Sequence, residues 1–97
     1  MFRKRATRIV TIGWPAGLHA RPSLAVAQIV RRFTAEVRVR RGDETVDGSD
    51  ILQLLSLGAD HGEELALSAQ GRDAYEVLDE LERLFANHEV PDTAASG

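Results

Sequence analysis

The spacing of apolar residues switches along the chain between strand and helix periods, and this switching most restricts the fold. Residues Ala35 to Arg40 alternate strictly between apolar and polar, which predicts a half-buried strand. From Asp73 to about His88 apolar residues recur at intervals of three and four, which predicts an amphipathic helix. The chain therefore contains both kinds of element, and each has an apolar face to bury.

The same patterns, with the turn residues between them, predict five further elements. We expect strands at 7–12, 45–47 and 64–69, and helices at 20–32 and 51–57. The order is then βαββαβα. Four strands with three helices on one face bury all of these apolar faces in a two-layer α+β domain. The pattern does not fix the strand order, because a ferredoxin-like sheet shares the first six elements.

The length of the chain and its lack of cysteine narrow the possibilities further. We expect one domain over residues 1–97, with a core at about 7–88 and a flexible tail at 89–97. No apolar run approaches 18 residues, so we expect no membrane insertion. The absence of cysteine excludes disulfides and thiol chemistry, which fits a cytoplasmic protein.

Charge is distributed unevenly along the chain. Residues 1–41 contain ten Lys and Arg against one acid, whereas residues 42–97 contain two against fourteen, which together give the net charge of −3. An acidic protein partner or an anionic group suits the basic half. We expect no nucleic-acid partner, because aromatic residues are only 5% and none lies on a predicted strand to stack on a base.

The most informative motif is the run from Gly17 to Pro22, which reads GLHARP. It places His19 where a helix begins, beside Arg21. A helix N-terminus presents free backbone N–H groups and a partial positive charge, so it favours anions. An imidazole there can accept a phosphoryl group that the amides of Ala20 and Arg21 then bind. The alternative is a chance histidine in a helix-entry loop. His61 and His88 complete no metal-ligand pattern, so we expect no metal.

Some leucines lie where no core is expected. Leu24 falls on a mostly polar helix stripe, and the short helix at 51–57 is apolar nearly all round. We expect Leu24, Leu52 and Leu55 to form an apolar partner interface beside His19. Asp50 precedes the short helix and is expected to cap it. The single tryptophan, Trp14, either packs under the site or faces a partner.

The chain resembles the HPr family, the histidine-containing phosphocarriers of phosphoenolpyruvate-dependent phosphotransferase systems. The resemblance runs from about Thr7 to His88. GLHARP looks like the active-site motif of the family, Ser56-Leu57-Gly58 after Ile51–Leu55 looks like its second signature, and residues 68–71 (SAQG) resemble the end of its last strand. The resemblance implies an open-faced β-sandwich with a four-stranded antiparallel sheet.

The resemblance also implies a function. His19 would accept a phosphoryl group on Nδ1 from phosphorylated enzyme I and pass it to an enzyme IIA, with Arg21 stabilising the group. Such a chain is a carrier and not a free-standing enzyme, and we expect a monomer without a cofactor. Asp50 stands at the position of the family's regulatory serine, as a plain cap or as an imitation of phosphoserine.

Three alternatives remain open at this stage. One is a regulatory paralogue of the nitrogen type or another metabolic-control type. Another is a ferredoxin-like binding module in which His19 is incidental. The last is an acylphosphatase-type enzyme, for which we see no placed carboxylate or amide.

Overall fold

The computed structural model describes residues 4–87, and its seven elements follow the predicted βαββαβα order. The elements are β1 (Arg5–Thr11), α1 (Ala20–Arg31), β2 (Glu36–Arg41), β3 (Glu44–Asp47), α2 (Ile51–Ser56), β4 (Glu64–Gln70) and α3 (Ala74–Ala86). Boundaries differ from the predicted ones by at most two residues, and four of them coincide: the starts of α1, α2 and β4 and the end of β3. The last helix was predicted to reach His88, which, like the predicted tail at 89–97, lies outside the described residues.

The four strands form one antiparallel sheet in the order β1-β4-β2-β3. The central strand β4 pairs with β1 on one side and with β2 on the other, so that Ser68 lies opposite both Thr7 and Arg38. The ferredoxin-like alternative requires β3, not β4, between β1 and β2. The observed order therefore excludes that arrangement.

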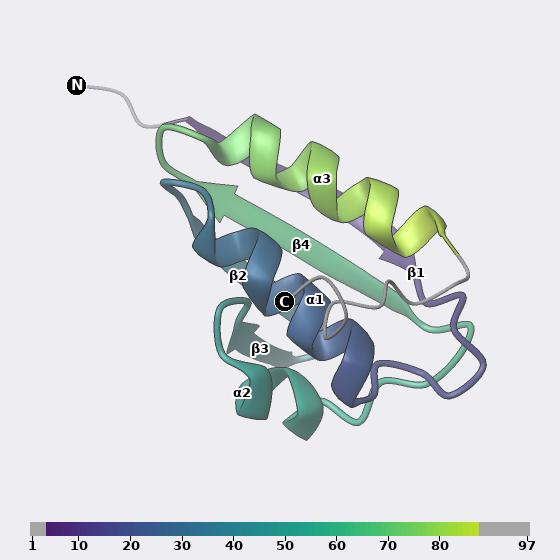
Figure 1. The fold of residues 1–97 in the computed structure, drawn as a ribbon. Coiled ribbons are helices and arrows are strands. Elements are labelled where there is room, and N and C mark those ends of the chain that lie inside the picture. Colours follow the sequence, from purple (N-terminus) through teal and green to yellow (C-terminus); the bar gives the residue numbers. More distant parts are fainter. Residues whose placement is uncertain (1–3, 88–97) are drawn as a thin grey trace.

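The three helices cover one face of the sheet and leave the other face open (Figure 1). The covered face carries the buried positions of the strands, among them Val37, Val39, Leu65 and Leu67. They contact the apolar stripes of α1 and α3, where Val26, Leu78 and Leu81 are fully buried. The two-layer α+β prediction is confirmed.

Ion pairs join the basic first half of the chain to its acidic second half. Arg8 of β1 pairs with Asp79, at 2.9 Å, and with Glu82, both on α3. Arg41 at the end of β2 pairs with Glu63, at 3.0 Å. Part of the charge asymmetry of the sequence thus connects elements that are far apart in the chain.

Candidate functional site

The segment that leads from β1 into α1 is hydrogen-bonded along the loop that precedes β4. We name residues 58–63 the support loop. Ile12 N–H donates to Glu63 O at 2.9 Å, Gly62 N–H donates to Ile12 O at 2.8 Å, and Leu18 N–H donates to Ala59 O at 2.9 Å. The residue before His19 is therefore fixed by a segment more than forty positions away in the sequence.

Gly17 allows this close approach. Its φ of +74° lies in the left-handed region, and a Cβ there would stand 2.6 Å from Ala59 O. Any larger residue would therefore combine an unfavourable backbone conformation with a steric clash. The glycine of the motif is explained by the geometry of the loop itself.

His19 is the N-cap residue of α1 and has extended backbone angles. Its carbonyl accepts from Ser23 N–H at 3.0 Å, while its half-buried imidazole makes no capping bond. The amides of Ala20 and Arg21 have no hydrogen-bond acceptor within residues 4–87. Pro22 follows in the first turn, where a missing N–H costs nothing. Two donors and the positive end of the helix dipole are therefore available beside the imidazole.

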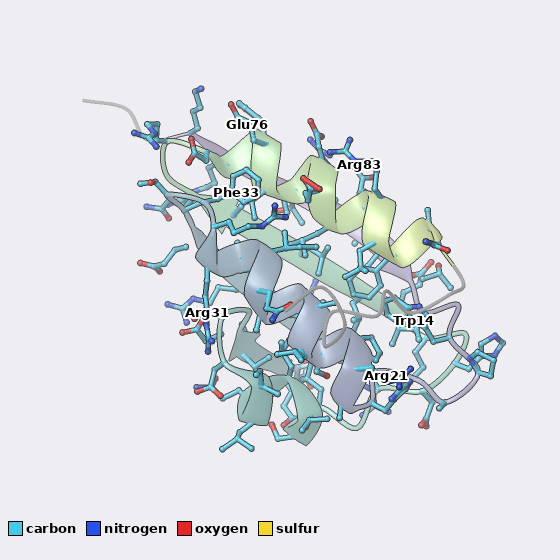
Figure 2. All side chains as sticks on the ribbon, viewed as in Figure 1. Trp14, Arg21, Arg31, Phe33, Glu76 and Arg83 are labelled. Carbon is cyan, nitrogen blue, oxygen red and sulfur yellow. The ribbon has the colours of Figure 1, made fainter. Side chains whose placement is uncertain are left out.

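Arg21 lies exposed at the N-terminal end of α1 (Figure 2). Its guanidinium forms no hydrogen bond or ion pair with any other described residue. Most other arginines in the described part of the chain have a partner, as Arg8 and Arg41 do. Arg21 and the two amides can thus bind an anion without breaking an existing contact.

The helices α1 and α2 lie side by side (Figure 1), and α2 carries exposed leucines. Leu52 is 78% exposed and Leu55 is 37% exposed, while Leu24 of α1 is half-buried. Arg31 Nε at the end of α1 donates to Ser49 O just before α2, at 3.0 Å. The two helices are therefore antiparallel, and the C-terminal end of α2 with Leu55 lies toward the His19 end of α1. We name Leu24, Leu52 and Leu55 the leucine surface.

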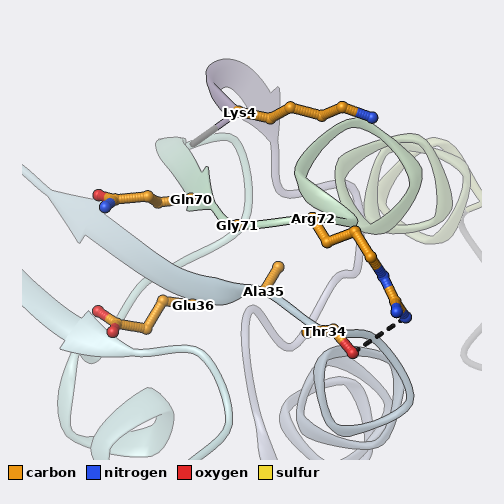
Figure 3. Close-up of a pocket in the computed structure, with 7 residues that line it drawn as sticks. All are labelled: Lys4, Thr34, Ala35, Glu36, Gln70, Gly71 and Arg72. Atoms are coloured by element: carbon orange, nitrogen blue, oxygen red, sulfur yellow. Dashed lines mark hydrogen bonds between the residues drawn. The ribbon is translucent and has the colours of Figure 1, made fainter. Parts of the chain in front are cut away.

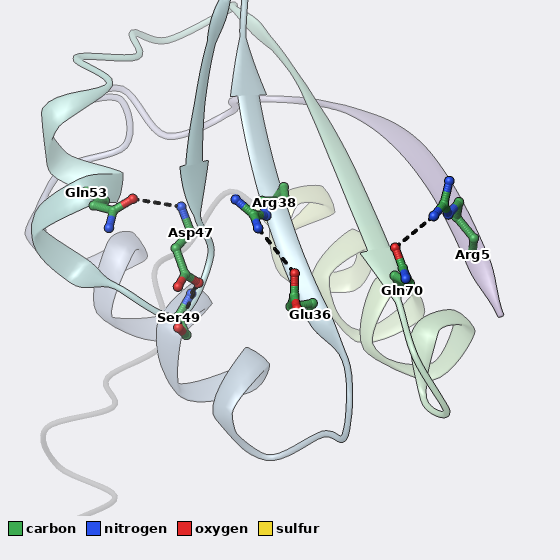
Figure 4. A network of polar contacts seen from close by, with 7 residues as sticks. All are labelled: Arg5, Glu36, Arg38, Asp47, Ser49, Gln53 and Gln70. Atoms are coloured by element: carbon green, nitrogen blue, oxygen red, sulfur yellow. Dashed lines mark hydrogen bonds and ion pairs between the residues drawn. The ribbon is translucent and has the colours of Figure 1, made fainter. Parts of the chain in front are cut away.

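Asp50 caps α2, as predicted. Its carboxylate accepts from Gln53 N–H at 3.1 Å and from the Gln53 side-chain amide at 3.2 Å. The preceding turn is ordered by Asp47, which accepts from Ser49 N–H and Ser49 Oγ (Figure 4). The Ser49 backbone N–H, the Ser49 hydroxyl and the field of Arg38 together hold the pKa of Asp47 below its usual value.

Trp14 packs beneath the site, which decides between the two roles left open by the sequence. Its side chain is 1% exposed and contacts the ring of Phe85 on α3, with ring centroids 5.0 Å apart (Figure 2). Its indole N–H has no acceptor among the described residues. Trp14 thus ties the His19 loop to the end of α3 by apolar contact.

The pairing of Arg41 with Glu63 beneath the support loop was not predicted from the sequence. Arg41 Nε lies 3.1 and 3.0 Å from the two carboxylate oxygens of Glu63. The Asp60 backbone N–H and then Arg41 hold the pKa of Glu63 below its usual value. Arg41 follows the predicted strand at 35–40, and its distance in sequence from Glu63 gave no signal of contact.

A cleft of about 440 Å³ lies away from this site, between the α1–β2 and β4–α3 turns (Figure 3). It lies at the C-terminal end of α1, whereas His19 is at the N-terminal end. Its cations already have contacts, because Arg72 donates to Thr34 Oγ1 at 3.2 Å and Lys4 lies over the Tyr75 ring. The cleft and the predicted site are therefore separate.

Residues 4–87 contain neither a metal-binding cluster nor a membrane-spanning helix. No group of His, Asp and Glu side chains there is clustered closely enough to hold a metal ion. No helix in that range has the length and apolar character needed to cross a bilayer. His61 is exposed in the support loop, as expected.

A half-buried imidazole at a helix N-terminus, two free helix amides and an unpaired guanidinium within residues 4–87, on an open-faced sandwich, form the arrangement expected of a phosphocarrier. A family model described as "PTS HPr component phosphorylation site" matches residues 6–87. The chain belongs to the HPr family of phosphocarrier proteins of the phosphotransferase system. Members of this family carry a phosphoryl group and are not free-standing enzymes.

Individual proteins agree with this assignment. The chain is 37% identical over 85 residues to the phosphocarrier protein HPr of Haloferax volcanii, covering 86% of this chain and 96% of that one. It is 42% identical over 71 residues to a multiphosphoryl transfer protein of Xanthomonas campestris, covering 73% of this chain but 8% of that much longer protein. Among solved structures, HPr from Bacillus anthracis superposes with a TM-score of 0.79 at 27% identity, covering 84% and 96%.

Proposed function

We propose that this chain accepts a phosphoryl group on His19 from phosphorylated enzyme I and passes it to an enzyme IIA component. A lone pair on the imidazole, Nδ1 by the family resemblance, attacks the phosphorus. One N–P bond forms as the bond between phosphorus and the donor group breaks. Phosphoryl transfer needs positioning and charge stabilisation more than covalent help from the protein.

The observation that carries the proposal is the set of unused donors around His19. The amides of Ala20 and Arg21 and the Arg21 guanidinium have no partner among the described residues. All three can donate to phosphoryl oxygens. Because the site is exposed and the group is shared with two partners, moderate stabilisation suits a relay better than tight capture.

Labelling with enzyme I and phosphoenolpyruvate tests the acceptor. Wild type should gain one phosphoryl group by intact-mass analysis, and the product should be acid-labile and alkali-stable, as a phosphoramidate is. His19→Ala should gain none. His61→Ala is the control, because His61 is more exposed than the half-buried His19 but does not lie at the start of a helix. Equal labelling of His19→Ala and wild type would refute the assignment.

We propose further that the leucine surface docks both partners. Leu52 and Leu55 are exposed on α2, which packs beside α1, and exposed apolar side chains are typical anchors of a transient interface. Leu52→Glu should raise the KM of enzyme I for this chain by about tenfold or more. Ile9→Glu is the control, because Ile9 is 57% exposed but lies on the open face of the sheet. Similar KM values for the two variants would contradict the docking role.

Transport and regulation share the same chemistry at His19 and differ in the acceptor. The observation that bears on regulation is Asp50, which keeps a negative charge at the position of the family's regulatory serine. Incubating the phosphorylated chain with sugar-type and nitrogen-type A components, and comparing the rates, identifies the acceptor. We propose that the chain acts as a monomer in the cytoplasm, as the family resemblance implies.

A further inference from the structure

The Arg41–Glu63 pair joins three segments: the end of β2, the end of α2 and the support loop. Arg41 ends β2, and Glu63 ends the support loop just before β4. Besides its bonds to Glu63, Arg41 donates from Nη1 to Leu57 O at 2.9 Å, at the end of α2. Both side chains are about one-third exposed, at 36% and 34%. One guanidinium therefore fixes the beginning and the end of the segment 57–63.

Glu63 passes this constraint on to the backbone that contacts the His19 segment. Its carboxylate accepts from Asp60 N–H at 2.7 Å, which fixes the middle of the support loop. Its carbonyl accepts from Ile12 N–H at 2.9 Å. Ala59, next to Asp60, accepts from Leu18 N–H. The path from Arg41 to the residue before His19 thus consists of hydrogen bonds and adjacent peptide units.

We propose that Arg41 and Glu63 are positioning residues for phosphoryl transfer at His19. They touch neither the imidazole nor the phosphoryl group. They hold the support loop in the position that orients Leu18, and through Leu18 the next residue, His19, which is the N-cap of α1. This inference rests on the proposed function of His19 and extends it to residues outside the motif.

The physical reason is that orientation and stability respond differently to such a pair. A half-exposed ion pair adds little to the free energy of unfolding, since solvent screens it. Transfer depends more steeply on geometry, because a displacement of about 1 Å of a reacting group can cost about 100-fold in rate. The pair should therefore matter more for transfer than for folding.

The chain offers a matched control in Arg8. Arg8 also joins two distant elements, since it bonds to Asp79 and Glu82 of α3. Its side chain is 28% exposed, similar to Arg41. It contacts neither the support loop nor the motif. A comparison of Arg41→Met with Arg8→Met thus separates two effects. Both variants lose an ion pair between distant elements, but only Arg41→Met loses the pair that holds the support loop.

The experiment measures phosphoryl transfer from enzyme I and the hydrogen exchange of the Leu18 amide in the same variants. For Arg41→Met we expect kcat to fall about tenfold while KM stays within about twofold, whereas Leu52→Glu changes mainly KM. The Leu18 amide should exchange about tenfold faster. Arg8→Met should match wild type in kcat and in Leu18 exchange. Glu63→Gln, which keeps an acceptor for Asp60 N–H, should lie between wild type and Arg41→Met.

The outcomes separate the two proposals. If wild type takes no label on His19, both the function and the positioning role are wrong. If wild type is labelled but Arg41→Met equals Arg8→Met in kcat, the positioning role alone is wrong. Faster Leu18 exchange without a change in kcat in either Arg41→Met or Glu63→Gln also overturns it, because the loop then moves without affecting transfer.

Discussion

Replacing Gly17 by alanine tests whether the His19 segment depends on its contact with the support loop. The new Cβ would stand 2.6 Å from Ala59 O, and a normal contact of 3.4 Å requires one of them to move by 0.8 Å. A left-handed conformation costs a non-glycine residue about 1 kcal/mol. The shift also disrupts the 2.9 Å bond from Leu18 N–H to Ala59 O, worth about 1–2 kcal/mol once a donor is left unpaired. We expect Gly17→Ala to lower the free energy of unfolding by about 3 kcal/mol.

Gly42→Ala is the control for the backbone term. Gly42 has a φ of +59°, but a Cβ there meets nothing within 4 Å. Its cost should be about 1 kcal/mol, and the entropy lost by the unfolded chain is the same for both variants. Thermal unfolding should therefore place the midpoint of Gly17→Ala about 10 °C below that of Gly42→Ala. Midpoints within about 2 °C of each other would refute the reasoning.

Further variants test three individual side chains. Arg21→Ala should slow phosphoryl transfer far more than it shifts the thermal midpoint, and an unchanged rate with a lowered midpoint would make Arg21 structural. Asp50→Ser should keep the cap and nearly the full stability, whereas Asp50→Ala should lose about 1 kcal/mol of stability. If Asp50→Ser instead binds enzyme I more tightly than wild type, and this difference shrinks at high salt, Asp50 imitates phosphoserine. The lowered pKa of Asp47 contributes stability above the unfolded pKa that is lost as pH falls below about 4. Asp47→Asn should therefore flatten the unfolding profile in that acid range, and an unaltered profile would contradict this.

The helices and strands were predicted well from local patterns, because the spacing of apolar residues within an element reflects which of its residues are buried. The alternation that marks Val37 and Val39 survives in the buried face of β2, and the spacing of Leu78 and Leu81 matches the buried stripe of α3. The cap by Asp50 was also predictable, since a capping bond spans only three residues. The fold class and the location of the motif follow from such patterns, which involve only residues close together in sequence.

Contacts between distant segments could not be predicted in the same way. The pairing of β4 with both β1 and β2 depends on packing of whole elements, which no single pattern encodes. The burial of Trp14 against Phe85 and the bond from Arg41 to Leu57 O join residues far apart in sequence. The sequence shows that residues able to make such contacts are present, but it does not show which of them pair with each other.

The strand order has a consequence for how the chain becomes able to accept a phosphoryl group. During synthesis the motif at His19 is complete long before Ala59 and β4 exist, yet its backbone is hydrogen-bonded to Ala59, and the strand before it, β1, pairs with β4. Closing so long a loop between β1 and β4 makes folding depend on late, non-local contacts. A nascent chain that ends before Glu64 therefore displays the motif without its geometry. Enzyme I should not phosphorylate such a chain, so that only a chain in which β4 has formed should accept a phosphoryl group.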